Sequence, residues 1–428
     1  MTTTETLSSK GPSTAAPLPE SEIPSHDELI ARARALRPLL IANQEATEKN
    51  TFPVQEVQQA FIDAGFYKVL TPKRYGGYQM GPWTFLKLAI ELARGCPSSA
   101  WCYTLGHSHA FTAAAYYSPE AQDELFADGG YLVAASFANP RGEAKRVDGG
   151  YIINGKFPYG SGSPYSNYYM GVVKAPAGSP HGPEGTQLVF TARRENYTLG
   201  DDWGENVLGM RGSGSATVTV TDAFVPDHLI ISKSFAELTP EGGGTVGSRF
   251  HNDATYAMPQ LGFATAYVPA LEIGMGYGML DAYEEVIKSR PPEIVSALVD
   301  PSLPKPKTKA EVPEFQRMYG MALTTFEAAE GIMKAASDEL VRMAERGEID
   351  MATNFKITSL TGFSGRLAWQ GAQEYLWRTG GSSQTANTSR MQRFYRDMSM
   401  WRTAPGSSQR DTIAEVYAQI MLAGPKGA

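Results

Sequence analysis

The stretch Leu208-Gly-Met-Arg-Gly-Ser-Gly-Ser215 runs directly into Ala216-Thr-Val-Thr-Val-Thr-Asp-Ala-Phe-Val-Pro226. The second segment alternates threonine with valine, which predicts a strand with one polar and one apolar face. The first segment holds three glycines, and glycine lets a backbone approach a ligand closely because it has no side chain. Arg211 and the hydroxyls of Ser213 and Ser215 then offer hydrogen bonds to a planar or phosphorylated ligand. An ordinary hairpin loop has the same composition, so the stretch by itself leaves both interpretations open.

The composition is that of a globular enzyme. The chain has 428 residues, which is enough for several structural layers around a large core. Its formal net charge of −7 argues against a nucleic-acid surface. Cys96 and Cys102 are too few for a disulfide scaffold or a metal site, and no apolar run has membrane-spanning length. We therefore expect no metal, no nucleic-acid partner and no membrane association, with the cytoplasm as the default location.

The chain divides into four regions by composition and apolar spacing. Residues 1–26 are rich in serine, threonine and proline and lack the apolar segment of a signal peptide, so we expect a disordered tail. Apolar residues recur at helical spacing in residues 27–130 and 241–428, whereas residues 131–240 contain short β-type runs between turn residues. This order predicts an α+β protein with an N-terminal helical domain, a central β-sandwich or barrel, and a C-terminal four-helix bundle.

The same spacing predicts individual elements. Asp27 is the expected cap of the first helix, and Asp148-Gly-Gly150 is typical of a hairpin turn. The expected N-terminal helices cover residues 27–50, 53–64, 83–94 and 98–117, with another beginning near Pro119. The expected strands cover residues 151–153, 168–173, 187–190 and 217–220. The expected bundle helices cover residues 268–288, 310–346, 354–379 and 408–422.

Several motifs, taken in order, resemble the acyl-CoA dehydrogenase superfamily. Within it, the chain looks most like the oxygenase components of two-component flavin-dependent monooxygenases (group D), which include aromatic hydroxylases and amine N-oxygenases. The resemblance covers nearly the whole chain after the tail. It rests on Asp63-Ala-Gly-Phe66, Thr71-Pro-Lys-Arg-Tyr-Gly-Gly77, Ser98-Ser-Ala-Trp101, Val147-Asp-Gly-Gly-Tyr-Ile-Ile-Asn-Gly155, Ser161-Gly162, Leu208 to Ser215, Asp222-Ala-Phe-Val-Pro226 and Gln392-Arg-Phe-Tyr-Arg-Asp397.

The resemblance implies where a flavin binds. In such proteins the ring lies between the β domain and the C-terminal bundle, and the matching positions here are Ser136, Phe137, Tyr159, Ser161, Arg211, Ser213 and Ser215. Gln373, Gly380 and Gly381 match positions that contact the phosphate or adenine end, often across a subunit interface. A plain pair of helix-capping glycines is the alternative interpretation of Gly380-Gly381.

The C-terminal segment bears on which flavin chemistry the resemblance implies. Many dehydrogenases place a glutamate base eight residues after an Arg-Asp pair, and here that position is Pro405, which cannot accept a proton. Phenol hydroxylases place a histidine where Ser399 and Ala404 stand, and all six histidines of this chain lie at or before His251. We therefore expect a substrate that needs no deprotonation from this side, such as an amine, a thioether or an electron-rich ring.

The remaining candidates lie near the expected ring. We take His109 and Ser161 as candidate catalytic residues, because an imidazole can hydrogen-bond a substrate or move a proton, and Trp101, His109, Trp401 and Arg402 as candidate substrate contacts. The alternatives are a histidine satisfied by a main-chain carbonyl, tryptophans that belong to the core, and an arginine in a surface ion pair.

The resemblance implies an oxygenase component that uses reduced FMN or FAD and O2, through a flavin C4a-hydroperoxide, to hydroxylate or N-oxygenate a small aromatic or amine metabolite. Such an intermediate survives only where water is excluded. A separate NAD(P)H-flavin reductase is expected, because no Gly-x-Gly-x-x-Gly fingerprint follows a strand. The long bundle helices suggest a homotetramer. The alternatives are an acyl-CoA dehydrogenase with a displaced base and a non-catalytic flavin-binding tetramer.

Overall fold

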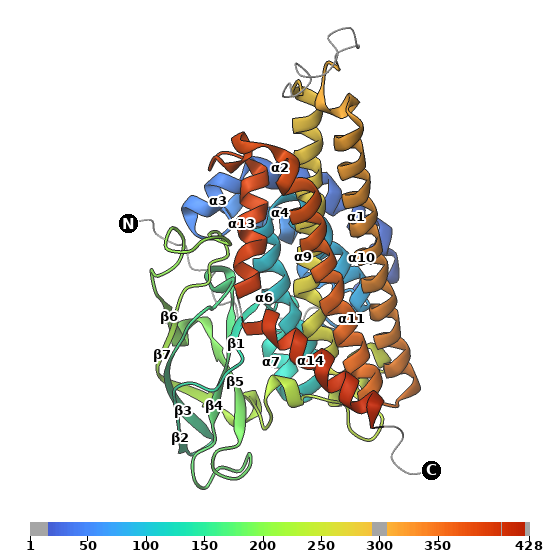
Figure 1. Cartoon of the computed structure of the whole chain (residues 1–428). Helices are drawn as coiled ribbons and strands as arrows, with labels where there is room; N and C mark the ends of the chain where they lie inside the picture. The colour runs from blue at the N-terminus through green and yellow to red at the C-terminus, as the bar shows by residue number, and fades with distance from the viewer. Residues whose placement is uncertain (1–15, 293–305, 404, 424–428) are drawn as a thin grey trace.

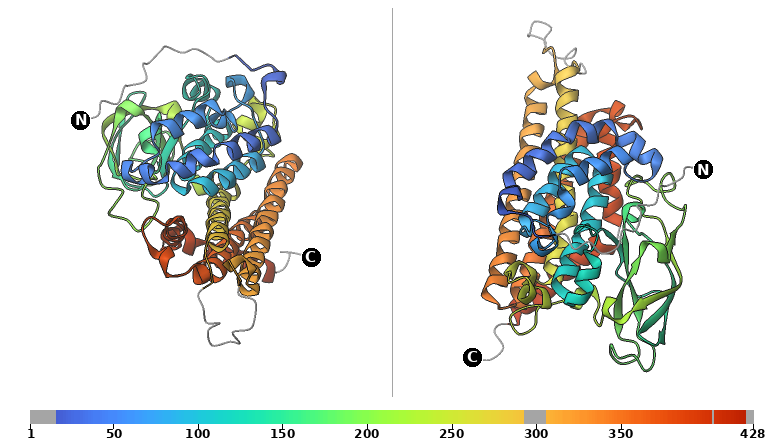
Figure 2. Two further views of the ribbon diagram at one scale, coloured as in Figure 1. Left: turned by 90° about the horizontal axis from the view of Figure 1, so that it is seen from above. Right: turned by 180° about the vertical axis from the view of Figure 1, so that it is seen from behind.

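The structure is a computed structural model that describes residues 16–292, 306–403 and 405–423 (Figure 1). The chain passes from helices through two sheets and back to helices, which confirms the expected α+β order. The sheets lie to one side of the helices, and the N-terminal helices pack against the long C-terminal ones (Figure 2). Of the expected disordered tail, residues 1–15 lie outside the described residues.

The N-terminal region is helical as expected, but its first helix is broken. Residues 27–50 form three helices instead of one. The first break lies at Leu36, two residues before Pro38, which cannot continue a helix, and the second lies at Asn43. Ser25, not Asp27, caps the first helix by accepting a hydrogen bond from the N–H of Glu28. The helices are α1 (His26–Ala35), α2 (Arg37–Ala42), α3 (Gln44–Asn50), α4 (Gln55–Asp63), α5 (Pro82–Gly95), α6 (Pro97–Tyr116) and α7 (Pro119–Leu125).

The central region forms two four-stranded sheets. Their orders are β1-β4-β5-β8, in which β1 and β4 are parallel, and β2-β3-β7-β6, which is antiparallel throughout. The hairpin expected at Asp148-Gly-Gly150 is confirmed, because Val147 pairs with Gly150 across a tight turn. The strands are β1 (Ala134–Phe137), β2 (Glu143–Val147), β3 (Gly150–Phe157), β4 (Tyr168–Lys174), β5 (Gln187–Arg193), β6 (Tyr197–Leu199), β7 (Val218–Pro226) and β8 (Ile230–Ile231).

The C-terminal region begins with the short helix α8 (Val246–Phe250) and continues with long helices. The expected helix over residues 408–422 is present as α14, which lies across α11, and a helix that periodicity does not predict, α13, packs against α9 (Figure 1). A π-helical segment (Gly371–Trp377) also joins α11 to α12, which periodicity does not predict. The remaining helices are α9 (Gln260–Ser289), α10 (Pro313–Arg346), α11 (Met351–Gln370), α12 (Arg378–Gly380), α13 (Arg390–Thr403) and α14 (Pro405–Leu422).

Helix α6 is the element through which the three regions meet. Almost all of its residues are buried, and it packs against α5, α9 and β1. A helix buried on every side has no face turned to solvent, which explains why its sequence shows little amphipathic pattern. Cys102, in the second turn of α6, lies beside the turns that precede β7 and follow β3, with Sγ 3.2 Å from the carbonyl of Ser213.

Candidate active site

Two turns of the β region meet side by side, and their serines form a buried chain of hydroxyls. Oγ of Ser215 lies 2.7 Å from both Oγ of Ser161 and Oγ of Ser213. The N–H of Gly162 donates to the carbonyl of Ser213 at 2.9 Å and so ties one turn to the other. At Gly160 an added Cβ would lie 2.6 Å from a neighbouring side chain, so this close approach requires glycine. The structure therefore brings together three of the expected cofactor residues.

An exposed aromatic and aliphatic rim borders the hydroxyl chain. Tyr159 lies two residues before Ser161 in a left-handed conformation, and it is 60% exposed although its ring centroid lies 5.9 Å from that of Trp203 in an edge-on contact. Trp203 in turn donates from Nε1 to the carbonyl of Met210 at 2.9 Å, and Leu208 is 58% exposed. Large apolar surface beside buried hydroxyls suits a flat, partly apolar ligand.

Arg211 lies in the same turn as the serines. Its Nε donates to the carbonyl of Val207 at 3.0 Å, which fixes the direction of the side chain. A guanidinium has five N–H groups, so this bond uses one donor of five. The side chain thus carries a fixed positive charge at the turn.

Two tryptophans join α6 to α13. The rings of Trp101 and Trp401 lie 5.6 Å apart in an edge-to-face arrangement, a favourable geometry for aromatic pairs. The next residue, Arg402, lies 2.9 Å from Glu272 on α9 and donates to the carbonyl of Gly365 on α11 at 3.0 Å. The Glu272 side chain is only 1% exposed, so the surface ion pair considered for Arg402 is wrong: this pair lies inside the bundle.

His109 is buried on α6 and held by its own helix. Its Nδ1 lies 2.8 Å from the carbonyl of Leu105, an arrangement in which Nδ1 carries the proton. Burial lowers the pKa of His109 to about 4 although main-chain carbonyls oppose that shift. The ring is therefore neutral near pH 7, and it contacts Phe235 edge-on at 5.9 Å.

His107 has a structural role. The N–H of Leu70 donates to its Nε2 at 3.2 Å, and its Nδ1 lies 3.4 Å from the carbonyl of Leu132. Both ring nitrogens are thus engaged by main chain, and burial lowers the pKa of His107 to about 3. Of the two histidines, His109 remains the candidate.

Comparisons with known proteins decide the family. The model of the acyl-CoA dehydrogenase N-terminal domain matches residues 25–128, and that of the C-terminal domain matches residues 266–403. A pigment production hydroxylase of Rhodococcus sp. (strain ATCC 21145) is 30% identical over 398 residues, which cover 92% of this chain and 96% of the relative. The chain belongs to the acyl-CoA dehydrogenase superfamily.

Within the superfamily, the chain is an oxygenase component of the flavin-dependent monooxygenases. HsaA, an oxygenase subunit of a flavin-dependent monooxygenase from Rhodococcus jostii (strain RHA1), is 28% identical over 379 residues, 86% of this chain and 91% of the relative. The fold agrees: XiaF from Streptomyces sp., solved in complex with FADH2 and glycerol, has a TM-score of 0.81 at 22% identity and covers 94% of this chain and 97% of its own.

The residues of this monooxygenase fit a flavin. Buried hydroxyls on Ser161 and Ser215 offer hydrogen bonds to the polar edge of a ring, and the exposed Tyr159 offers apolar cover. Arg211 supplies positive charge, which suits a reduced, anionic flavin. Ser136 and Phe137 end β1 beside β4, and the contacts among described residues do not join them to the hydroxyl chain.

The residues expected at the far end of the flavin lie apart from this chain of serines. Gln373 is in the π-helical segment, a feature that often marks functional sites. Gly381 has a φ of 91°, which favours glycine. A Cβ at Gly380 would lie 2.8 Å from Cε of Met391, the end of a flexible side chain that can move aside. Only Gly381 is therefore explained by the backbone, and contact of either glycine with a cofactor remains a prediction.

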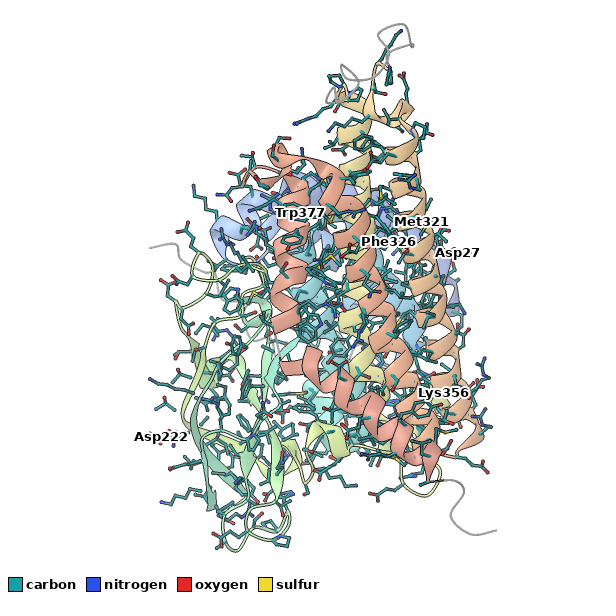
Figure 3. The ribbon with its side chains drawn as sticks, viewed as in Figure 1. Asp27, Asp222, Met321, Phe326, Lys356 and Trp377 are labelled. Atoms are coloured by element: carbon teal, nitrogen blue, oxygen red, sulfur yellow. The ribbon has the colours of Figure 1, made fainter. Side chains whose placement is uncertain are left out.

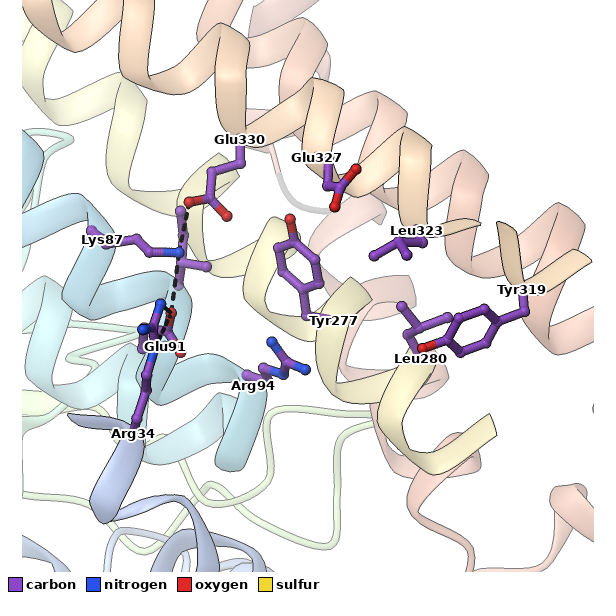
Figure 4. Close-up of a pocket in the computed structure, with 11 residues that line it drawn as sticks. Arg34, Lys87, Glu91, Arg94, Tyr277, Leu280, Tyr319, Leu323, Glu327 and Glu330 are labelled. Carbon is purple, nitrogen blue, oxygen red and sulfur yellow. Dashed lines mark hydrogen bonds and ion pairs between the residues drawn. The ribbon is translucent and has the colours of Figure 1, made fainter. Parts of the chain in front are cut away.

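A cleft elsewhere in the monooxygenase is not part of this site. It has a volume of about 260 Å³ and lies among α5, α9 and α10 (Figure 4). Lys87 of the cleft lies 2.6 Å from Glu330, and Arg94 lies 2.7 Å from Asp281, so neighbouring carboxylates neutralise these cations. None of the expected site residues is among the described residues that line it.

The described residues contain neither a metal-binding cluster nor a membrane-spanning helix. No group of three or more histidine, cysteine, aspartate or glutamate side chains in residues 16–292, 306–403 and 405–423 is arranged to hold a metal ion. In the same ranges no helix combines the length and apolarity that crossing a membrane requires. Cys96 and Cys102 are buried free thiols, and Sγ of Cys102 lies 3.2 Å from the carbonyl of Ser213.

The structure adds one functional feature that sequence reasoning missed. Asp397 hydrogen-bonds the turn that carries Arg211, through the N–H of Met210. From the sequence, Asp397 is identified only as the acidic member of the Arg-Asp pair. The clustering of Arg393, Arg396 and Asp397 in one helix is the sequence feature that points to a buried ionic contact.

Proposed function

We propose that this chain uses reduced FMN or FAD, together with O2, to hydroxylate or N-oxygenate a small aromatic or amine metabolite. The observation that carries the proposal is the buried Ser161–Ser215–Ser213 hydroxyl chain, whose Ser161 lies two residues after the exposed Tyr159. When bound, reduced flavin supplies the two electrons that activate O2. The contribution of the protein is a set of fixed hydrogen-bond donors in a site from which bulk water is excluded.

Ser161 and His109 are the proposed catalytic residues. Ser161 is 9% exposed and ends the hydroxyl chain, so its O–H is the one placed to donate beyond the cluster. His109 is neutral near pH 7 and presents Nε2 as an acceptor when Nδ1 holds the proton. A neutral imidazole can orient an O–H or N–H of the substrate or accept its proton after oxygen transfer.

The proposed substrate site lies by Trp101 and Trp401, with Arg402 behind them. The arginine is already balanced by Glu272, which favours an uncharged aromatic or amine over a carboxylic acid. The names of similar proteins agree with an aromatic substrate: one is a resorcinol hydroxylase of Rhizobium sp. (strain MTP-10005), and TdsC of Paenibacillus sp. A11-2 has been solved with FMN and indole. The relatives use both flavins, so the proposal keeps FMN and FAD open.

The remaining proposals concern partners, assembly and domains. A separate NAD(P)H-flavin reductase would supply the reduced flavin, in the cytoplasm. Exposed apolar side chains on three bundle helices support a homotetramer, which would cover them; Met321 lies on the outer side of α10 (Figure 3). These side chains are Met321, Leu360, Phe363, Met421 and Leu422. We further propose residues 27–130, 131–240 and 241–428 as the domains, with Gln373, Gly380 and Gly381 completing the cofactor site of a neighbouring subunit.

Rapid mixing of the flavin-reduced protein with oxygen tests the proposal. We expect an absorbance intermediate, distinct from reduced and oxidised flavin, that persists long enough to react with substrate. Direct return to oxidised flavin with release of peroxide would contradict it. Anaerobic reduction of bound flavin by an acyl thioester would support the dehydrogenase alternative instead, and flavin binding without either reaction would support a non-catalytic protein.

Reduced-flavin binding tests the cofactor residues separately. Arg211→Ala removes the positive charge at the turn, and we expect the dissociation constant for reduced flavin to rise about tenfold. Oxidised flavin carries less negative charge, so its affinity should change less. An unchanged affinity for reduced flavin would refute the assignment of Arg211.

A further inference from the structure

The Gln392-Arg-Phe-Tyr-Arg-Asp397 motif contacts the turn that carries Arg211. It lies on α13, and its last residue points at the glycine-rich turn. Oδ1 of Asp397 accepts a hydrogen bond from the N–H of Met210 at 2.6 Å, and Asp397 is 1% exposed. The bond joins residues 187 positions apart, so it links the bundle directly to the cofactor turn.

The turn also contacts the backbone of α13. A Cβ added at Gly209 would lie 2.3 Å from the carbonyl oxygen of Arg396 and 2.7 Å from the N of Asp397. Nη1 of Arg396 lies 3.5 Å from the carbonyl of Leu208. Three consecutive residues of the turn therefore rest on two consecutive residues of one helix.

Helix α13 is itself anchored to the N-terminal region at this point. Oε1 of Glu48 on α3 lies 2.5 Å from Nη2 of Arg396 and 3.0 Å from Nε of Arg393. Their side chains are only 6 to 14% exposed, and charge-assisted hydrogen bonds with little water around them hold geometry firmly. The turn is thus fixed against a helix that cannot shift without breaking these pairs.

The backbone of the turn needs such support. Met210 has a φ of 54°, which is unfavourable for a residue other than glycine and persists only when surroundings hold it. Arg211 follows directly, so the direction of its side chain depends on the conformation of Met210. Ser213 and Ser215 come next in the same turn.

We propose that Asp397 is a positioning residue for the flavin: by holding the N–H of Met210, it fixes the strained turn that aims Arg211 and the serine hydroxyls at the cofactor. The expected effect of Asp397 on flavin affinity rests on the proposed function, because it requires that the turn binds flavin. The contact itself is independent of that function. Asp397 touches neither cofactor nor substrate in this account and acts through the main chain of the turn.

The test compares variants of the full-length protein by two measurements. Hydrogen exchange of peptides covering residues 207–215 reports the turn without flavin, and titration reports the dissociation constant for reduced FMN and reduced FAD. We expect Asp397→Ala to speed exchange in these peptides and to weaken binding about thirtyfold, whereas Asp397→Asn retains an acceptor and weakens it about threefold. Gly209→Ala, which pushes the turn off α13 without changing Asp397, should resemble Asp397→Ala.

A matched control separates positioning from general destabilisation. Asp281→Asn disrupts another inter-helix ion pair, with Arg94, that contacts no residue of the turn, and it should leave exchange in residues 207–215 and flavin affinity unchanged. Unchanged exchange in both Asp397→Ala and Gly209→Ala would overturn the inference. If the wild type binds no flavin, the proposed function fails while the exchange result still decides the contact. If Asp397→Ala does not fold, Asp397→Asn and Gly209→Ala decide it.

Discussion

Ser215→Ala is the sharpest test of the hydroxyl chain, because Ser215 is its middle member. Its removal takes away two hydrogen bonds of 2.7 Å and leaves the hydroxyls of Ser161 and Ser213 without that partner. A neutral hydrogen bond contributes about 1 kcal/mol net, and a stranded buried hydroxyl costs about 1–3 kcal/mol. We therefore expect the free energy of unfolding to fall by about 2–3 kcal/mol, measured by urea denaturation.

The same change should affect reactivity more than flavin binding. Without Ser215, the hydroxyl of Ser161 loses the neighbour that orients it, and a misdirected donor would no longer stabilise negative charge on a bound flavin. A loss of about 1.4 kcal/mol corresponds to a tenfold change in rate. We expect the absorbance intermediate to decay about tenfold faster, with more peroxide released per reduced flavin consumed.

Ser163→Ala is the matched control. Ser163 is as deeply buried and lies in the turn of Ser161, but its Oγ donates a hydrogen bond to the carbonyl of Gly214 at 3.2 Å and lies outside the chain. The free energy of unfolding of Ser163→Ala should fall by about 1 kcal/mol, and its absorbance intermediate should last as long as that of the wild type. Equal lifetimes in Ser215→Ala and the wild type would refute the reasoning, whatever the stability of the variant.

Three further predictions use other parts of the site. His109→Ala should lower product formation while the dissociation constant for reduced flavin stays near that of the wild type; full coupling in the variant, measured as product per reduced flavin, would show that His109 is structural. Cys96 and Cys102 should react with iodoacetamide at pH 8 only after unfolding, because burial raises the pKa of Cys96 to about 11 and raises that of Cys102 as well; rapid alkylation of the native protein, followed by mass spectrometry, would contradict this. Burial also raises the pKa of Asp397 to about 7, so the folded protein holds this proton more tightly than the unfolded chain; its contribution to stability is present below about pH 4 and is lost as the pH rises through about 7. Asp397→Asn should therefore become more stable relative to the wild type between pH 5 and pH 8 in urea titrations, and a constant difference would show that the group does not titrate there.

The sequence could predict elements whose burial follows a simple period. Alternating threonine and valine from Thr217 onward predict a strand, and the structure confirms it as part of β7. The glycines of Asp148-Gly-Gly150 predict a hairpin turn, which is also confirmed. Helix α13 could not be predicted in this way. Its buried face contains Arg393, Arg396 and Asp397, which a pattern of apolar residues assigns to the surface. These charges are buried because Glu48 and the turn satisfy them, and neither partner is near in sequence.

The site residues show the same division. Ser161, Ser213 and Ser215 follow from motifs that the chain shares with its superfamily, and the structure brings them into one chain of hydrogen bonds. The partner of Arg402 could not be inferred, since Glu272 lies on another helix of the bundle. Hydrogen bonds and ion pairs between distant segments depend on side-chain geometry, which carries no periodic signal in the sequence.

The contact between Asp397 and Met210 carries a free-energy cost, because it requires a buried carboxylate. A carboxylate buried to 1% exposure with a raised pKa disfavours the folded state at neutral pH by up to about 4 kcal/mol. A residue selected for stability alone would be neutral here, as Asn is. The ionised carboxylate, however, accepts the N–H of Met210 more strongly than a neutral amide does, and the strained turn needs that strength. Asp397→Asn should therefore gain stability at pH 8 and lose flavin affinity in the same sample. A variant that changed both in the same direction would show that residue 397 serves folding and not the cofactor.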